Sequence, residues 1–233
     1  MRMYNEVILD ESPETIITID HLPEYDIEDY DLSNPKILHK FLTQVEYVCR
    51  KSRCYKKFIQ FLKDQCDMNK CSFYKNLNGI STSEIKIHMH HEPLTLYDIV
   101  NIIYNKRLQN HESLSEFQIA KEVMYNHYKM MIGLIPLSET VHELVHNGFL
   151  FIPTNVVFGY YKHFIQEYEP YIEPGILQIL KYNEKVTETY NFEKETKVLT
   201  MEVVYIDTTG AYELPKVKDI MKLFEEKINQ INN

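Results

Sequence analysis

The stretch Pro136-Leu-Ser-Glu-Thr-Val-His-Glu-Leu-Val-His-Asn-Gly148 decides how the rest of the fold is interpreted. It predicts one short helix, because Ser138 can accept a free backbone N–H at the start and Gly148 can adopt the left-handed conformation that ends a helix. His142 and His146 are four residues apart, so they lie on one face of that helix. They flank a stripe of apolar residues that we expect to be buried: Val141, Leu144 and Val145. Such a histidine pair supplies half of a metal site.

A second histidine pair, His90-His91, lies in the segment Ile85-Lys-Ile-His-Met-His-His-Glu-Pro93. Apolar and polar residues alternate in this segment, which predicts a β-strand. Ile132-Gly-Leu-Ile-Pro-Leu137 is apolar, directly precedes the helix and predicts a second strand. The order of a strand with His-His, an apolar strand and a helix with H-x3-H resembles the HNH (His-Me finger, ββα-metal) nucleases, most closely the nuclease colicins. The resemblance covers about residues 85–95 and 130–150.

The resemblance implies a metal-dependent endonuclease that hydrolyses the phosphodiester bonds of DNA. Carried over by position, His90, His142 and His146 are the ligands of one divalent ion (Zn, Mg, Mn or Ni), and His91 is the general base. Three neutral imidazoles can hold an ion and leave positions open for phosphate and water. A fourth imidazole can take a proton from water at neutral pH.

Three further residues are candidates for the same site. The middle Asn of the HNH pattern falls at Gly133 in this chain, and Asn126 is the nearest substitute. His88 lies two residues before His90 and therefore on the same side of the predicted strand. His127 lies at the end of a predicted helix, close to the site in sequence.

Two other functions are compatible with the sequence. His142-Glu-Leu-Val-His146 also matches the H-E-x-x-H pattern of zinc peptidases, in which Glu143 would be the base and a downstream carboxylate such as Glu167 the third ligand. Alternatively, the chain is a non-enzymatic phage structural or interaction protein with a degenerate HNH-like fold. The variant Glu143→Gln distinguishes the peptidase from the nuclease. It should abolish peptidase activity, whereas a nuclease does not depend on that carboxylate.

Composition indicates a soluble globular protein. Of the 233 residues, 44% are hydrophobic and 25% charged, which is typical of that class. Because the chain has no apolar run of about 18 residues and its first residues lack a signal-peptide core, we expect a cytoplasmic protein without a membrane partner. Frequent Tyr, Asn, Lys and Ile together with the absence of Trp favour an AT-rich genome and a phage origin, and hence the host cytoplasm.

Charge is distributed unevenly along the chain. Residues 1–35 hold ten acidic side chains and one basic one, whereas residues 36–75 hold ten basic and three acidic ones. The basic residues that surround Tyr55 predict a nucleic-acid contact, with DNA as the partner. They are Arg50, Lys51, Arg53, Lys56 and Lys57.

The predicted fold is a single α+β domain, a ββα-metal finger with a two-helix insertion inside a larger mixed domain. We divide it into an acidic extension (1–35), a basic helical segment (36–80), the HNH-like core (81–150) and a C-terminal α+β part (151–233). Apolar periodicity predicts one helix over 36–64, or two that break near Ser52. The insertion (95–130) predicts two helices, the second capped by Ser113, which serve as a lid or as the face of a homodimer.

The remaining segments carry simpler expectations. Short strands are predicted at 6–10 and 14–20, helices at 155–169, 175–182 and 215–232, and a long strand pair within 185–207. The four cysteines are spaced as C-x4-C twice, which is wider than zinc prefers and favours buried free thiols.

Overall fold

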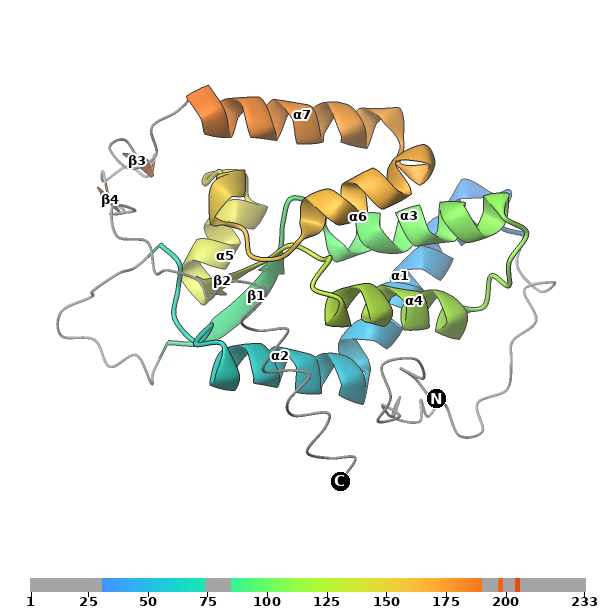
Figure 1. The fold of residues 1–233 in the computed structure, drawn as a ribbon, viewed down its shortest axis with the longest axis horizontal. Helices are drawn as coiled ribbons and strands as arrows, with labels where there is room; N and C mark the ends of the chain where they lie inside the picture. Colours follow the sequence, from blue (N-terminus) through green and yellow to red (C-terminus); the bar gives the residue numbers. More distant parts are fainter. Residues whose placement is uncertain (1–30, 74–84, 190–196, 199–203, 206–233) are drawn as a thin grey trace.

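The computed structural model describes residues 31–73 and 85–189, together with the backbone of 197–198 and 204–205. It combines helices with small antiparallel sheets, so the α+β class is confirmed (Figure 1). The strands predicted at 6–10 and 14–20, the acidic extension up to residue 30 and the helix at 215–232 lie outside the described residues. None of the described helices is both long enough and apolar enough to cross a membrane.

The basic segment forms two helices, α1 (Pro35–Lys51) and α2 (Arg53–Gln65), which meet at Ser52. The Ser52 hydroxyl donates to the Cys49 carbonyl oxygen (2.8 Å) and accepts from the backbone N–H of Tyr55 (3.0 Å). One buried serine therefore ends the first helix and caps the second, as the break predicted near this residue required.

A two-stranded antiparallel sheet lies beside the helices. Strand β1 (Ile87–His91) pairs with β2 (Leu134–Ser138), with His90 opposite Ile135 and His91 opposite Leu134. Helix α5 (Glu139–His146) follows β2 directly. Both predicted strands and the short helix are confirmed.

The segment between the two strands folds as α3 (Leu96–Gln109) and α4 (Glu116–Tyr128). Thr95 caps α3 through a reciprocal capping box with Asp98. For α4 the predicted cap was wrong, because Ser115 and not Ser113 accepts the Gln118 N–H (3.2 Å).

Both inserted helices pack against α1, and α4 also packs against α2. Their buried side chains belong to the main core together with residues of α1, α2 and the later helices, for example Phe41, Phe58, Ile103, Val123 and Phe164. The insertion is therefore the centre of a helical body, and its predicted role as a lid over the finger was wrong. A smaller core of Ile135, Leu137, Val141 and neighbouring residues lies under α5.

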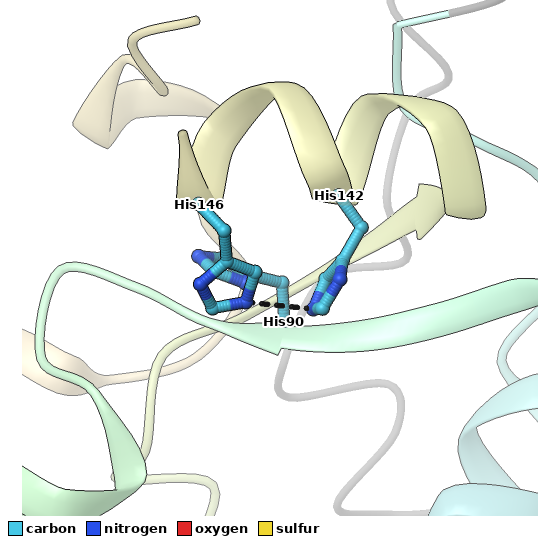
Figure 2. Close-up of side chains that lie close together, drawn as sticks. All are labelled: His90, His142 and His146. Carbon is cyan, nitrogen blue, oxygen red and sulfur yellow. Dashed lines mark hydrogen bonds between the residues drawn. The ribbon is translucent and has the colours of Figure 1, made fainter. Parts of the chain in front are cut away.

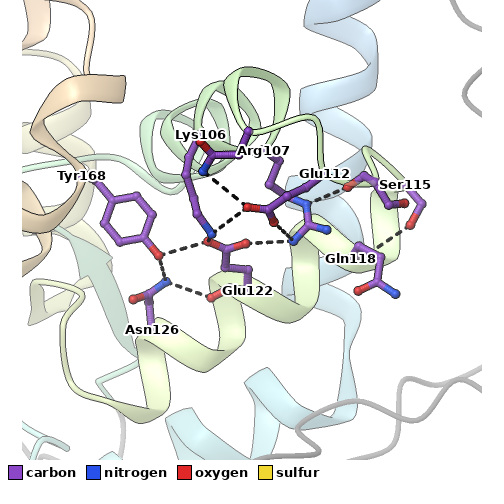
Figure 3. A network of polar contacts seen from close by, with 10 residues as sticks. Lys106, Arg107, Glu112, Ser115, Gln118, Glu122, Asn126 and Tyr168 are labelled. Atoms are coloured by element: carbon purple, nitrogen blue, oxygen red, sulfur yellow. Dashed lines mark hydrogen bonds and ion pairs between the residues drawn. The ribbon is translucent and has the colours of Figure 1, made fainter.

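A polar network joins α3, α4 and α6 (Tyr161–Tyr168) inside this body (Figure 3). The Glu122 carboxylate lies 2.8 Å from Lys106 Nζ and 2.9 Å from Arg107 Nη1. The Tyr168 hydroxyl donates to Glu122 (3.1 Å) and accepts from Asn126 Nδ2 (3.0 Å). Asn126 is thus part of the network that ties the helices together.

The C-terminal part is more helical than predicted. The region 155–169 contains the 3-10 turn η3 (Thr154–Val156) and α6, and a second turn, η4 (Glu169–Tyr171), leads into α7. Helix α7 spans Pro174–Thr189, so the strand pair predicted from residue 185 starts later, as β3 (Lys197–Val198) and β4 (Val204–Tyr205). Leu180 is buried, and Ile176 and Leu177 pack against the main core, which explains why the helix continues along this surface.

All four cysteines are buried free thiols, as predicted. Burial raises the pKa of Cys54 to about 12, and it also raises the pKa of Cys49. These side chains therefore behave as small apolar core residues.

Candidate metal centre

Three histidines from two elements converge at one point (Figure 2). His90 comes from β1, and His142 and His146 come from α5. One ring nitrogen from each lies within 4.8 Å of the other two, and the Nε2 atoms of His142 and His146 are 3.2 Å apart. Among the described residues this is the one group of three or more His, Cys, Asp or Glu side chains with such spacing.

Local sequence explains the convergence. The Ser138 hydroxyl accepts the Val141 N–H (3.4 Å) and starts α5, while Gly148 has a φ of +71° just beyond its end. Buried Val141 anchors α5 over the sheet, so that both imidazoles are turned toward β1. Alternation along β1 places His90 on the α5 side of the strand.

The environment keeps the two imidazoles of α5 neutral. Burial, reinforced by the neighbouring His146, His90 and His88 rings, lowers the pKa of His142 to about 4. Burial also lowers the pKa of His146. Neutral imidazole is the form that binds a metal, because the ligand nitrogen must carry a free lone pair.

The donor set fits a divalent ion. Nitrogens that bind one tetrahedral ion at about 2.1 Å lie about 3.4 Å from each other, a value that small side-chain rotations reach from the separations described above. Imidazole donors suit zinc, nickel, copper and iron, whereas magnesium and manganese prefer oxygen. The residues present therefore fit zinc or nickel better than magnesium.

His88 lies beside this centre but outside the set of three. Its ring stacks on His142 with 5.1 Å between ring centroids, and its Nε2 is 3.7 Å from Glu139 Oε1. That nitrogen is enclosed. His88 can hold the His142 ring in place by stacking, and its own Nε2 has no hydrogen-bond partner among the described residues.

His91 lies on the other face of β1, toward the helical body. Its Nε2 is 3.0 Å from Nε2 of His127 on α4, and its ring stacks on Tyr55 of α2. Only 4% of His91 and none of His127 is exposed. Burial and the proximity of His127, Arg50 and His90 hold the pKa of His91 well below its usual range. His127 is thus a partner of the predicted base and not of the metal centre.

A cleft of about 540 Å³ runs along the free edge of β1. Its lining consists of residues 86–91, His142 and His146 of α5, side chains of α1 and α2, and Thr95 and Leu96. His90 and His91 both line this cleft although their rings lie on opposite faces of the strand. The candidate ligands and the candidate base therefore share one space.

Three basic side chains line the cleft. Arg50 is held by Glu46 (2.8 Å), Lys63 Nζ donates to the Ile87 carbonyl oxygen (2.6 Å), and Lys86 contacts Glu139 (3.1 Å). Lys63 and Lys86 were missed in the sequence. The helical spacing of Lys63 from Tyr55 and Ile59, which also line the cleft, was the available signal.

Most of the predicted nucleic-acid contacts lie outside the cleft. Lys51, Arg53, Lys56 and Lys57 are exposed on the surface of α1 and α2, and only Arg50 reaches the cleft. Tyr55 is 8% exposed and packs on His91, so its ring does not lie on the surface with the basic residues that surround it in the sequence.

The remaining candidates are not brought to the centre. A Cβ atom on Gly133 would collide with the Glu92 carbonyl oxygen, so the position of the HNH Asn has no room for a side chain. Asn126 is committed to the network of Figure 3. Glu143 is exposed and does not line the cleft, and Glu167 of α6 is not in the cluster of possible ligands.

Comparison with known proteins gives one result. No curated protein and no solved structure matches the chain. The model of a family described as bacteriophage G278-like virion protein matches residues 9–231, which is nearly the whole length. This match supports the phage origin that residue usage predicted. The chain therefore belongs to the bacteriophage G278-like virion protein family.

Proposed function

We propose that this virion protein is a metal-dependent endonuclease that hydrolyses DNA with a single divalent ion. His90, His142 and His146 are the ligands, and His91 is the general base. The observation that carries the proposal is the convergence of three imidazoles within 4.8 Å beside a cleft that a fourth imidazole also lines. Clusters of neutral titratable groups in a cleft are typical of functional sites.

The side chains have distinct tasks in this proposal. A bound divalent ion would stabilise the negative charge on the scissile phosphate and the leaving oxygen. His91 accepts the proton of the attacking water, and its lowered pKa means that the ring is unprotonated before that step. Arg50 and Lys86 offer positive charge to the phosphates of a strand in the cleft.

We infer further that β1, β2 and α5 form a ββα-metal finger. The order and pairing of these elements support it, as does the origin of the ligands in the first strand and the helix. The finger differs from a compact one because residues 92–133 separate its two strands. The inserted helices belong to the helical body and supply His127 to the base.

A second candidate function is a structural virion protein in which the histidine cluster, with or without an ion, contributes only to stability. Two observations favour it: the family is described as one of virion proteins, and Gly133 leaves no room for the HNH Asn. A peptidase receives no such support, because Glu143 does not line the cleft.

Plasmid cleavage tests the proposal. Purified protein is incubated with supercoiled plasmid and Mg²⁺, Mn²⁺, Ni²⁺ or Zn²⁺, and nicked and linear products are quantified. We expect ion-dependent cleavage that His91→Ala lowers by about 10²- to 10⁴-fold, the usual contribution of a general base, while metal affinity is retained. The control is His163→Ala, which changes an exposed histidine of α6 outside the cleft. Absence of cleavage with every ion, together with thermal stabilisation by Zn²⁺, would favour the structural role.

A further inference from the structure

The hydrogen bonds of His127 determine which of its nitrogens carries a proton. Its Nδ1 lies 2.8 Å from the carbonyl oxygen of Val123, which can only accept. Nδ1 must therefore be the protonated nitrogen. Burial lowers the pKa of His127 to about 4, so at neutral pH the ring holds one proton and Nε2 has a free lone pair.

The protonated nitrogen of His91 follows from that of His127. Nε2 of His91 faces that lone pair at 3.0 Å, so His91 must donate, and its proton is on Nε2. A neutral imidazole has only one N–H, and therefore Nδ1 of His91 keeps its lone pair. Since His91 lines the cleft, Nδ1 is the nitrogen left to accept a proton there.

Aromatic side chains enclose this pair. Tyr55 stacks on His91 with 13° between the ring planes, and it meets His127 edge to face. Phe58 also contacts His127 edge to face, with ring centroids 5.6 Å apart. In such apolar surroundings an unpaired N–H is costly, so the contact between the two imidazoles is strongly favoured over its absence.

We propose that His127 is a positioning residue, which holds His91 in the Nε2–H tautomer and thereby leaves Nδ1 as the base that faces the cleft. This inference rests on the proposed function only where it treats His91 as the general base. The tautomer itself follows from the chain of hydrogen bonds from His91 through His127 to Val123.

NMR of the imidazole nitrogens tests the tautomer without any substrate. Protein with ¹⁵N-labelled histidine is recorded at pH 7.5, and long-range ¹H–¹⁵N correlations report which nitrogen of each ring is protonated. We expect Nε2–H for His91 and Nδ1–H for His127. A protonated Nδ1 on His91 overturns the proposal, even for a protein that cleaves DNA.

Two variants test the positioning role. His127→Gln offers an amide oxygen close to the position of Nε2, whereas His127→Leu removes the acceptor and keeps an apolar side chain. We expect His127→Leu to lower plasmid cleavage by about 10- to 100-fold, as loss of an orienting partner does at metal sites, and to leave Zn²⁺ affinity unchanged. His127→Gln should restore most of the activity.

The outcomes separate this proposal from the preceding one. If the wild-type protein cleaves no DNA but shows Nε2–H on His91 and mixed tautomers in His127→Leu, the proposed function fails and the tautomer control stands. Equal cleavage by His127→Leu and the wild type overturns the positioning role. Should His127→Leu not fold, the NMR reading of the wild type and the activity of His127→Gln still decide.

Discussion

Two polar clusters of this protein have opposite chemistry. Around Glu122, positive and negative side chains alternate, since Lys106 and Arg107 contact both Glu112 and Glu122 (Figure 3). In the histidine centre, three identical groups face one another (Figure 2). The Glu122 network pairs opposite charges within the protein, whereas the histidine centre brings together ring nitrogens whose lone pairs a cation can bind.

The difference separates a network of complementary charges from a group of like side chains, and we propose that only the second binds an ion. In a network of complementary charges each member has its partner within the protein, so that removing one member leaves a charge unpaired and destabilises the fold. A group of neutral imidazoles gains little from its members, and such groups persist at sites that serve a ligand. The following experiments test whether the two clusters differ in this way.

The largest effect is expected from removing a ligand of the histidine centre. His142→Ala should weaken Zn²⁺ binding by about 70- to 900-fold, because a total of about 10–16 kcal/mol is divided over roughly four ligands. Isothermal titration calorimetry measures the change. The matched control is His88→Ala, since His88 stacks on His142 but lies outside the set of three. Equal losses in both variants would show that the ion does not use this set.

Removal of Glu122 should have the next largest effect, on stability and not on binding. Glu122→Ala leaves Arg107 and Lys106 without their closest partner inside the body. We expect the free energy of unfolding to fall by about 3 kcal/mol, the cost of breaking a largely buried ion pair. Urea denaturation gives this value. Glu143→Ala, an exposed change on α5, should cost less than about 0.5 kcal/mol. A loss of Zn²⁺ affinity in Glu122→Ala would contradict the separation of the two clusters.

Mild acid should have a moderate effect through the buried imidazoles. Because the pKa of His127 is about 4 in the folded protein and about 6.5 in the unfolded chain, the unfolded chain binds the proton first as pH falls. Stability is therefore full above pH 6.5 and decreases below it. Between pH 7.5 and pH 5 this one group removes about 2 kcal/mol from the free energy of unfolding. Urea denaturation at both values checks the change, and His127→Gln should show a smaller dependence. Equal stability of the wild type at both pH values would contradict the buried, neutral ring.

The smallest effect is expected on the basic side of the cleft. Lys86→Ala removes one exposed charge beside the histidine centre and should weaken DNA binding by a few-fold, with a decrease of about 1 in the salt slope. Fluorescence anisotropy over a range of salt concentrations measures both. Lys185→Ala on α7 is the control, because this exposed lysine lies outside the cleft. The same loss in both variants would indicate a diffuse charge effect.

Features with local causes could be predicted from the sequence. The caps and the four-residue spacing of α5 are sufficient to put His142 and His146 on one face, and alternation in β1 is sufficient to put His90 and His91 on opposite faces. The break between α1 and α2 was similarly predicted near Ser52.

Features that depend on packing between distant segments could not be predicted from the sequence. His127 meets His91 only because α4 docks on the same body as β1, and no local pattern encodes that contact. The crowding at Gly133 arises from the Glu92 carbonyl oxygen, across the connection between the strands. The role of the insertion was missed for the same reason, since the periodicity of a helix shows that it has a buried face but not what covers it.

The long connection between β1 and β2 affects the order in which folding and ion binding should occur. Helices α3 and α4 lie between His90 and His142 in the chain and belong to the helical body, so we expect the two histidines to meet after these helices have docked. Closing such a loop before those helices dock would lose chain entropy without a compensating core. Uptake of the ion that we propose should thus follow folding, and we expect folding to begin without it.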